Sequence, residues 1–176
     1  RREAAVASMA NHDTLTGLPT RRLLLDRLTQ ALADRRRAAP GHDRLALFFV
    51  DLDGFKRIND VHGHEGGDLV LREVAQRMQA SLRAGDTVAR FGGDEFLVLV
   101  KHLPGREAAG MQAEKLLRVI ADPIPLGAEA DGVTMGASIG IAMAPEHGDQ
   151  GDLLINRADQ AMYRCKGSRE PSVCFF

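Results

Sequence analysis

The sequence has only two cysteines, almost no net charge and no long hydrophobic run. Cys165 and Cys174 lack the spacing of a metal-binding motif, and two thiols in 176 residues do not form a disulfide framework, so we expect both to be reduced. The 23 Lys and Arg residues nearly balance the 24 Asp and Glu residues, which argues against non-specific binding to nucleic acid. The longest apolar run, at residues 45–50, is too short to cross a membrane, and no signal peptide opens the chain. We therefore expect a cytoplasmic domain that does not insert into a membrane.

The apolar content of 44% is enough for one buried core in a chain of this length. Helical and strand patterns alternate without internal repeats, which predicts a single α/β or α+β domain. The patterns predict helices at 20–37, 54–58, 69–82, 107–121 and 153–165, and strands at 45–51, 88–91, 96–100, 133–143 and 173–176. Residues 1–12 look helical but lack a strong apolar face, so we expect a linker helix from a missing upstream region, followed by a domain over 13–176.

A tight turn carries two adjacent carboxylates. The β-prone segments at 88–91 and 96–100 flank Gly92-Gly93-Asp94-Glu95, which predicts an antiparallel hairpin. The glycines leave room for a ligand to approach the backbone, and hard cations prefer carboxylate oxygens such as those of Asp94 and Glu95. The same four residues also suit an ordinary turn without any function.

A second pair of carboxylates ends the apolar strand near residue 50. Asp51 and Asp53 project to the same side of a strand, so their carboxylates converge at one end of the sheet. Together with the hairpin they could seat Mg²⁺, whose remaining positions are filled by water and phosphate oxygens. Asp53 could instead be the N-cap of the short helix at 54–58.

Residues 92–96 read Gly-Gly-Asp-Glu-Phe, and further segments keep a matching order and spacing along the chain. These segments are DTLTGLPTRR at 13–22, FVDLDGFKRIND at 49–60, Gly63-His64, Gly67-Asp68, ASIGI at 137–141, PEHG at 145–148 and ADQAMYRCK at 158–166. With them the chain resembles the GGDEF family of diguanylate cyclases. The resemblance implies an α+β fold, with a central, mainly antiparallel five-stranded sheet surrounded by helices, like the palm of nucleotide cyclases and polymerases.

The resemblance also implies an activity in bacterial second-messenger signalling. Each of two subunits binds one GTP, and the 3′-hydroxyl of one GTP attacks the α-phosphate of the other, giving cyclic di-GMP and two pyrophosphates with Mg²⁺ or Mn²⁺ as cofactor. The implied partners are a second copy of the chain and an upstream sensor or regulatory domain. The alternative is a non-catalytic regulatory domain that binds GTP or cyclic di-GMP.

The resemblance assigns metal binding to Asp51, the backbone carbonyl of Leu52, and Asp94. Asp94 is also implied to help deprotonate the attacking hydroxyl, although a bound metal can lower the hydroxyl pKa enough for water to accept the proton. Glu95 is implied to support the same catalytic site.

Substrate binding is implied for six residues. They are Asn59 and Asp68 for guanine, Lys56 and Lys166 for the phosphates, and Gly92 and Gly93 in the turn. An amide and a carboxylate suit the edge of guanine, and a lysine serves phosphate as a mobile point charge. Taken alone, Asp68 could be the N-cap of the helix at 69–82, Asn59 could end a helix, and either lysine could be an ordinary surface residue.

Arg83-Ala-Gly-Asp86 lies just before the hairpin, at the spacing of the family's inhibitory product site. An arginine can grip O6 and N7 of a guanine together, and an aspartate can accept from its other edge. Without the resemblance, Arg83 and Asp86 would be a helix-end ion pair worth less than about 1 kcal/mol.

Two positions depart from the family pattern. Thr20 stands where the entry motif usually has Asn, which we expect to alter a local turn. Glu170 stands where a phosphate-binding arginine is usual, so repulsion could weaken GTP binding, and the neighbouring Arg169 could substitute.

Overall fold

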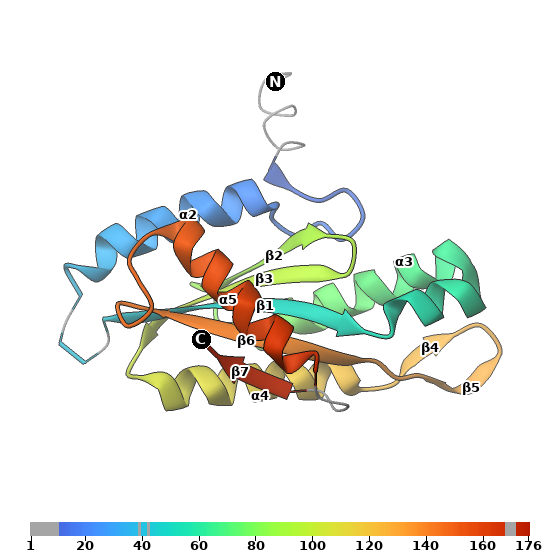
Figure 1. Cartoon of the computed structure of the whole chain (residues 1–176). Helices are drawn as coiled ribbons and strands as arrows, with labels where there is room; N and C mark the ends of the chain where they lie inside the picture. The colour runs from blue at the N-terminus through green and yellow to red at the C-terminus, as the bar shows by residue number, and fades with distance from the viewer. Residues whose placement is uncertain (1–10, 39, 42, 168–171) are drawn as a thin grey trace, which may run out of the picture.

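The structure is a computed structural model that describes residues 11–38, 40–41, 43–167 and 172–176 (Figure 1). The predicted linker helix at 1–12 lies, except for Asn11 and His12, outside the described residues, and so do Arg169 and Glu170. The elements are α2 Arg21–Arg35, β1 Arg44–Asp53, α3 Phe55–Ser81, β2 Thr87–Gly92, β3 Glu95–Leu103, α4 Arg106–Ala121, β4 Ile124–Leu126, β5 Glu129–Val133, β6 Gly136–Ala144, α5 Gly151–Cys165 and β7 Ser172–Phe175.

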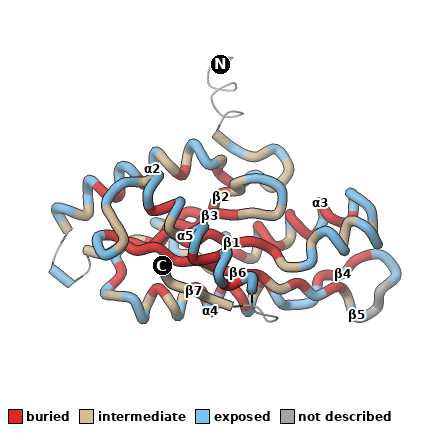
Figure 2. The backbone as a smooth tube through the Cα atoms, in the orientation of Figure 1, coloured by how far each residue is buried: buried red, intermediate tan, exposed pale blue. Residues whose placement is uncertain are grey.

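The main sheet has five strands in the order β2-β3-β1-β6-β7. All of its pairs are antiparallel except the edge pair of β6 and β7, which is parallel. β1 is the central strand, and its residues 45–52 are all buried, because helices cover both faces of the sheet (Figure 2). The predicted mainly antiparallel five-stranded sheet is confirmed.

Side chains alternate along β1 between two apolar layers. Ala46, Phe48 and Val50 pack in a cluster with α3 and α4. Leu45, Leu47 and Phe49 pack in a second cluster with α2 and α5. By the same alternation, Asp51 belongs to the face that α2 and α5 cover, which places it on the side of the sheet where α5 ends.

The local structure differs from the sequence-based expectations in the elements around Gly63 and around Val133. The helices expected at 54–58 and 69–82 belong to one element, α3, which is interrupted at Gly63 (φ 70°, ψ 176°). Its N-cap is Gly54 rather than Asp53, and Asp68 lies inside the helix rather than at its start. The strand expected at 133–143 is divided into β5 and β6, and β5 pairs with β4 in a separate two-stranded hairpin.

The departure at Thr20 has a local structural role. The Thr20 side chain caps α2 by accepting a hydrogen bond from the backbone N–H of Leu23 at 3.5 Å. Threonine is among the residues that favour this position, so the substitution keeps a helix start at the end of the entry segment.

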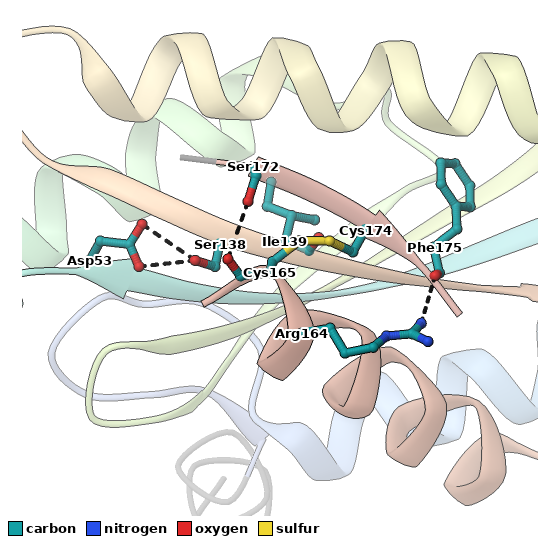
Figure 3. The surroundings of a disulfide bond; sticks show 8 residues. All are labelled: Asp53, Ser138, Ile139, Arg164, Cys165, Ser172, Cys174 and Phe175. Atoms are coloured by element: carbon teal, nitrogen blue, oxygen red, sulfur yellow. Dashed lines mark hydrogen bonds between the residues drawn. A yellow bond between two sulfur atoms is a disulfide. The ribbon is translucent and has the colours of Figure 1, made fainter. Parts of the chain in front are cut away.

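Cys165 and Cys174 are joined by a disulfide, so the expectation that both are reduced is wrong (Figure 3). The bond connects the last residue of α5 to β7 across a sequence separation of 9. The pairing depends on β7 lying parallel to β6, which brings Cys174 opposite Gly140 and beside the end of α5. The spacing of the cysteines in the sequence does not reveal this adjacency.

Within the described ranges, no helix combines the length and the apolar character that crossing a membrane requires.

The tight contact of α5 with β6 yields a stability prediction. A Cβ at Gly140 would lie 2.0 Å from the Ala158 carbonyl oxygen and 2.2 Å from the Met162 nitrogen, both of them backbone atoms that cannot rotate away. We expect Gly140→Ala to lower the free energy of unfolding by about 3 kcal/mol, measured by denaturant titration.

Gly110→Ala is the matched control. A Cβ there would meet only Phe175 ring atoms at 3.7 Å, an ordinary contact on a helix. Alanine should therefore stabilise α4 by up to about 1 kcal/mol. Equal effects of the two substitutions would contradict the packing described here.

Candidate active site

Four carboxylates gather at the end of β1 and at the adjoining turn. In the sheet, Asp51 lies opposite Glu95 of β3 on one side and Ser138 of β6 on the other. The backbone N–H of Leu52 donates to the Asp94 carbonyl at 3.2 Å, which fastens the β2–β3 turn to β1. Asp51 is only 5% exposed, and the Asp53 carboxylate accepts a hydrogen bond from the Ser138 hydroxyl at 3.0 Å. The strand end and the turn therefore form one acidic site.

Burial, and to a lesser extent mutual repulsion, raises the pKa values of three of these carboxylates. Burial raises the pKa of Asp94, and the nearby charge of Asp51 raises it further. Burial also raises the pKa of Glu95, with added repulsion from Asp51 and Asp94. The pKa of Asp53 is raised by burial and by Asp51, although the hydrogen bond from Ser138 opposes the shift. The site therefore favours the arrival of positive charge.

Lys166 supplies one such charge from the C-terminal end of α5. Its ammonium forms an ion pair with the Asp51 carboxylate, whose side chain is 7% exposed, whereas that of Lys166 is 39% exposed. Burial opposes the charged form, but the hydrogen bond and the charge of Asp51 outweigh it and raise the pKa of Lys166. The structure thus places Lys166 beside Asp51, while its predicted contact with phosphate stays a prediction.

The donor set suits Mg²⁺ bound together with a ligand. Among the residues that the structure describes, no group of three or more His, Cys, Asp or Glu side chains is arranged to hold a metal. However, the Leu52 N–H next to Asp51 donates to the Asp94 carbonyl, and the charge of Asp51 acts on the Asp94 carboxylate. Mg²⁺ typically takes one or two carboxylates and completes its shell with water and phosphate oxygens, so these residues fit the ion.

Arg90 holds the turn in place, a role that no local sequence pattern indicates. Its Nε and Nη2 donate to the Gly93 carbonyl at 3.1 and 2.9 Å. Its Nη1 lies 3.2 Å from the carboxylate of Asp13, which also accepts from the hydroxyl and the backbone N–H of Thr16. Burial opposes ionisation of Asp13, but these hydrogen bonds and the Arg90 charge lower its pKa. The entry segment thus holds the turn through the half-buried ion pair of Asp13 and Arg90.

The kink in α3 packs Asn59 against Gly67, the residue that precedes Asp68. Asn59 precedes the interruption at Gly63, and Asp68 follows it. A Cβ at Gly67 would lie 1.9 Å from Asn59 Oδ1, so the glycine leaves the space that the amide occupies beside Asp68. Lys56 is exposed in the first turn of α3.

Arg83 and Asp86 lie apart from the carboxylates, at a cavity of about 170 Å³ between the C-terminal end of α3 and the start of β2. The cavity is also lined by Arg27 of α2, whose guanidinium donates to the Thr87 hydroxyl at 3.0 Å. The Asp86 carboxylate accepts from the backbone N–H of Lys101 at 3.1 Å and from that of Arg83 at 3.4 Å. These bonds fix Asp86 at the cavity, which the exposed Arg83 also lines.

The family model described as "Diguanylate cyclase, GGDEF domain" matches residues 10–171. The chain belongs to the GGDEF family. This assignment confirms the resemblance that the motifs indicate.

Individual relatives agree with the assignment. The chain is 44% identical over its whole length to MucR of Pseudomonas aeruginosa, named a bifunctional diguanylate cyclase/cyclic di-GMP phosphodiesterase, but it spans only 25% of MucR. The solved GGDEF domain of TpbB from the same organism matches with a TM-score of 0.86 and 41% identity over 93% of each chain. The coiled coil and GGDEF domain of DgcB from Caulobacter crescentus, solved with c-di-GMP, matches with a TM-score of 0.86 and 25% identity over 99% of this chain and 90% of that one. The predicted palm-like α+β fold is therefore confirmed.

The raised carboxylate pKa values of this GGDEF domain predict how its stability depends on pH. An acid whose pKa is raised by folding holds its proton more tightly in the folded state, so ionisation costs stability as pH rises from about 4 through the raised value. Without metal, Asp94→Asn should be more stable than the parent at pH 8 by up to about 1 kcal/mol after solvent screening, and the difference should shrink as pH falls.

Thermal denaturation with and without Mg²⁺ completes this test. The ion should raise the melting temperature of the parent at pH 8 and should do so much less in Asp94→Asn, because a ligand stabilises only the state that binds it. Glu114→Gln, on the exposed side of α4, is the control and should respond as the parent does. An Asp94→Asn variant that is less stable at every pH and equally stabilised by Mg²⁺ would contradict the arrangement.

Proposed function

We propose that the domain is a diguanylate cyclase, which condenses two GTP molecules into cyclic di-GMP and releases two pyrophosphates. The observation that carries this proposal is the meeting of an intact Gly92-Gly93-Asp94-Glu95 turn with the buried carboxylate of Asp51. The proposal is supported by two relatives, MucR and TpbB, because both are named as diguanylate cyclases.

The proposed cofactor is Mg²⁺ or Mn²⁺. Its ligands are the carboxylates of Asp51 and Asp94 and the backbone carbonyl of Leu52. A bound ion would neutralise phosphate charge and polarise the attacked phosphorus. Glu95 adds negative charge beside Asp94 and so favours retention of the cation.

Nucleotide binding uses both sides of this acidic site. Asn59 and Asp68 read the edge of guanine, and Lys56 and Lys166 contact the phosphates. At Gly92 and Gly93 no described heavy atom lies within 4 Å of the position that a Cβ would take, so phosphate oxygens can approach the turn backbone.

The reaction requires two copies of the domain. Each copy holds one GTP, and the 3′-hydroxyl of each nucleotide attacks the α-phosphorus of the other, with Asp94 placed to help remove the hydroxyl proton. Homodimerisation, driven by an upstream sensor or regulatory region, would set the rate at which the two sites meet.

Formation of cyclic di-GMP from GTP and Mg²⁺, with the domain fused to a dimeric coiled coil, tests this function. The parent should form product, and Asp94→Ala should lower the rate by roughly 100-fold or more because the cation loses a ligand. Glu114→Gln should retain the parental rate. If none of the proteins forms product while GTP or cyclic di-GMP still binds in titrations, the domain is a non-catalytic regulatory domain instead.

The cavity at Arg83 and Asp86 is proposed to bind cyclic di-GMP and inhibit the enzyme. Arg83→Ala should weaken inhibition by added cyclic di-GMP roughly 10-fold, because one arginine–guanine contact contributes about 1–3 kcal/mol. The initial rate without product should stay near that of the parent, since the cavity lies apart from the carboxylates. An Arg83→Ala enzyme as sensitive to product as the parent would rule out this site.

A further inference from the structure

The position of Lys166 is set by the last turn of α5. Lys166 directly follows Cys165, and its backbone N–H donates to the Met162 carbonyl at 3.1 Å as the C-cap of the helix. From this position its side chain reaches Asp51. Any movement of the end of α5 therefore moves a positive charge at the acidic site.

The disulfide fixes this helix end to the sheet. Cys165 is 1% exposed, and its Cα lies 5.8 Å from that of Cys174 on β7. Ser172 of β7 is paired with Ser138 of β6, which is itself paired with Asp51 of β1. Cys174 therefore lies two residues along β7 from Ser172, which belongs to the same row of the sheet as Asp51.

Two hydrogen bonds also connect α5 with β7. The Arg164 guanidinium donates to the Phe175 carbonyl at 2.8 Å, and the Ser172 hydroxyl donates to the Cys165 carbonyl at 3.4 Å (Figure 3). β7 is a short edge strand of half-buried residues, so such bonds compete with water. The close contact at Gly140 holds the middle of α5 independently of the disulfide. Loss of the covalent bond should therefore loosen the last turn while the rest of the helix stays packed.

The fold also accommodates the reduced state. The Cys165 sulfur lies 3.6 Å from the Ile139 carbonyl oxygen, so a thiol at this position has an acceptor for its proton. Reduction would thus leave the buried Cys165 thiol hydrogen-bonded to the Ile139 carbonyl, and the domain could stay folded.

We propose that the Cys165–Cys174 disulfide positions Lys166 at the acidic site, so that binding of GTP depends on the thiol redox state. This inference rests on the proposed cyclase function. The step is a two-electron reduction by a dithiol: the S–S bond breaks, each sulfur leaves as a thiol with one proton, and the dithiol becomes a disulfide. An enzyme that consumes GTP works in the reducing cytoplasm, where disulfides are usually redox-sensing.

The test compares the oxidised domain, the domain reduced with dithiothreitol, and Cys174→Ser, all as coiled-coil dimers. Reduction should raise KM for GTP roughly three- to tenfold and change kcat less, because a phosphate contact is weakened. Cys174→Ser should resemble the reduced parent and should not respond to dithiothreitol. Cys174 is the position to change because it is half-exposed, whereas Cys165 is buried.

A second readout follows Lys166 without using activity. Brief acylation and mass spectrometry should show faster modification of Lys166 after reduction, while Lys56, Lys101 and Lys115 serve as internal references and stay unchanged. Free thiols in the air-oxidised parent would overturn the proposal. A lower melting temperature with unchanged Lys166 labelling and unchanged KM would also overturn it, because the bond would then be structural only. If the parent forms no cyclic di-GMP, the cyclase function fails, and the labelling alone decides whether the disulfide positions Lys166.

Discussion

The site depends on keeping the charge of Asp51 buried at the end of the central strand. An ionised carboxylate in such a place is costly unless a cation or hydrogen-bond donors accompany it. The fold supplies the ammonium of Lys166 to Asp51. It also places Asp94 and Glu95 nearby, and their negative charges repel that of Asp51. An acidic site paired with the ammonium of Lys166 is suited to exchange that ammonium for a metal and to offer the freed lysine to phosphate.

The rest of the architecture serves to fix the groups around Asp51. β1 is buried on both faces, and its alternation directs Asp51 toward the layer of α2 and α5. Arg90 connects Asp13 to the Gly93 carbonyl and so holds the turn. The disulfide holds the end of α5, which carries Lys166 as its C-cap. Three segments that are distant in the sequence therefore converge on one carboxylate.

The sequence predicts the parts of the site that depend on local patterns. The hairpin is recognisable from two β-prone segments around Gly92 and Gly93, and the strand of Asp51 from its apolar run. The Arg90 brace and the disulfide depend on tertiary neighbours, so spacing alone could not reveal them. The alternative role of Asp53 as a helix N-cap is not seen, because Gly54 (φ 78°) takes that position and the Asp53 carboxylate accepts a hydrogen bond from Ser138. The roles of the individual site residues in binding and catalysis stay predictions.

A crystal structure with Mn²⁺ and a non-hydrolysable GTP analogue is the most direct test of this account, because anomalous scattering locates the metal. The account predicts Mn²⁺ bound to the carboxylates of Asp51 and Asp94, guanine beside Asn59 and Asp68, and Lys166 moved from Asp51 to a phosphate. Mn²⁺ bound elsewhere, or a nucleotide bound while Lys166 remains paired with Asp51, would contradict it.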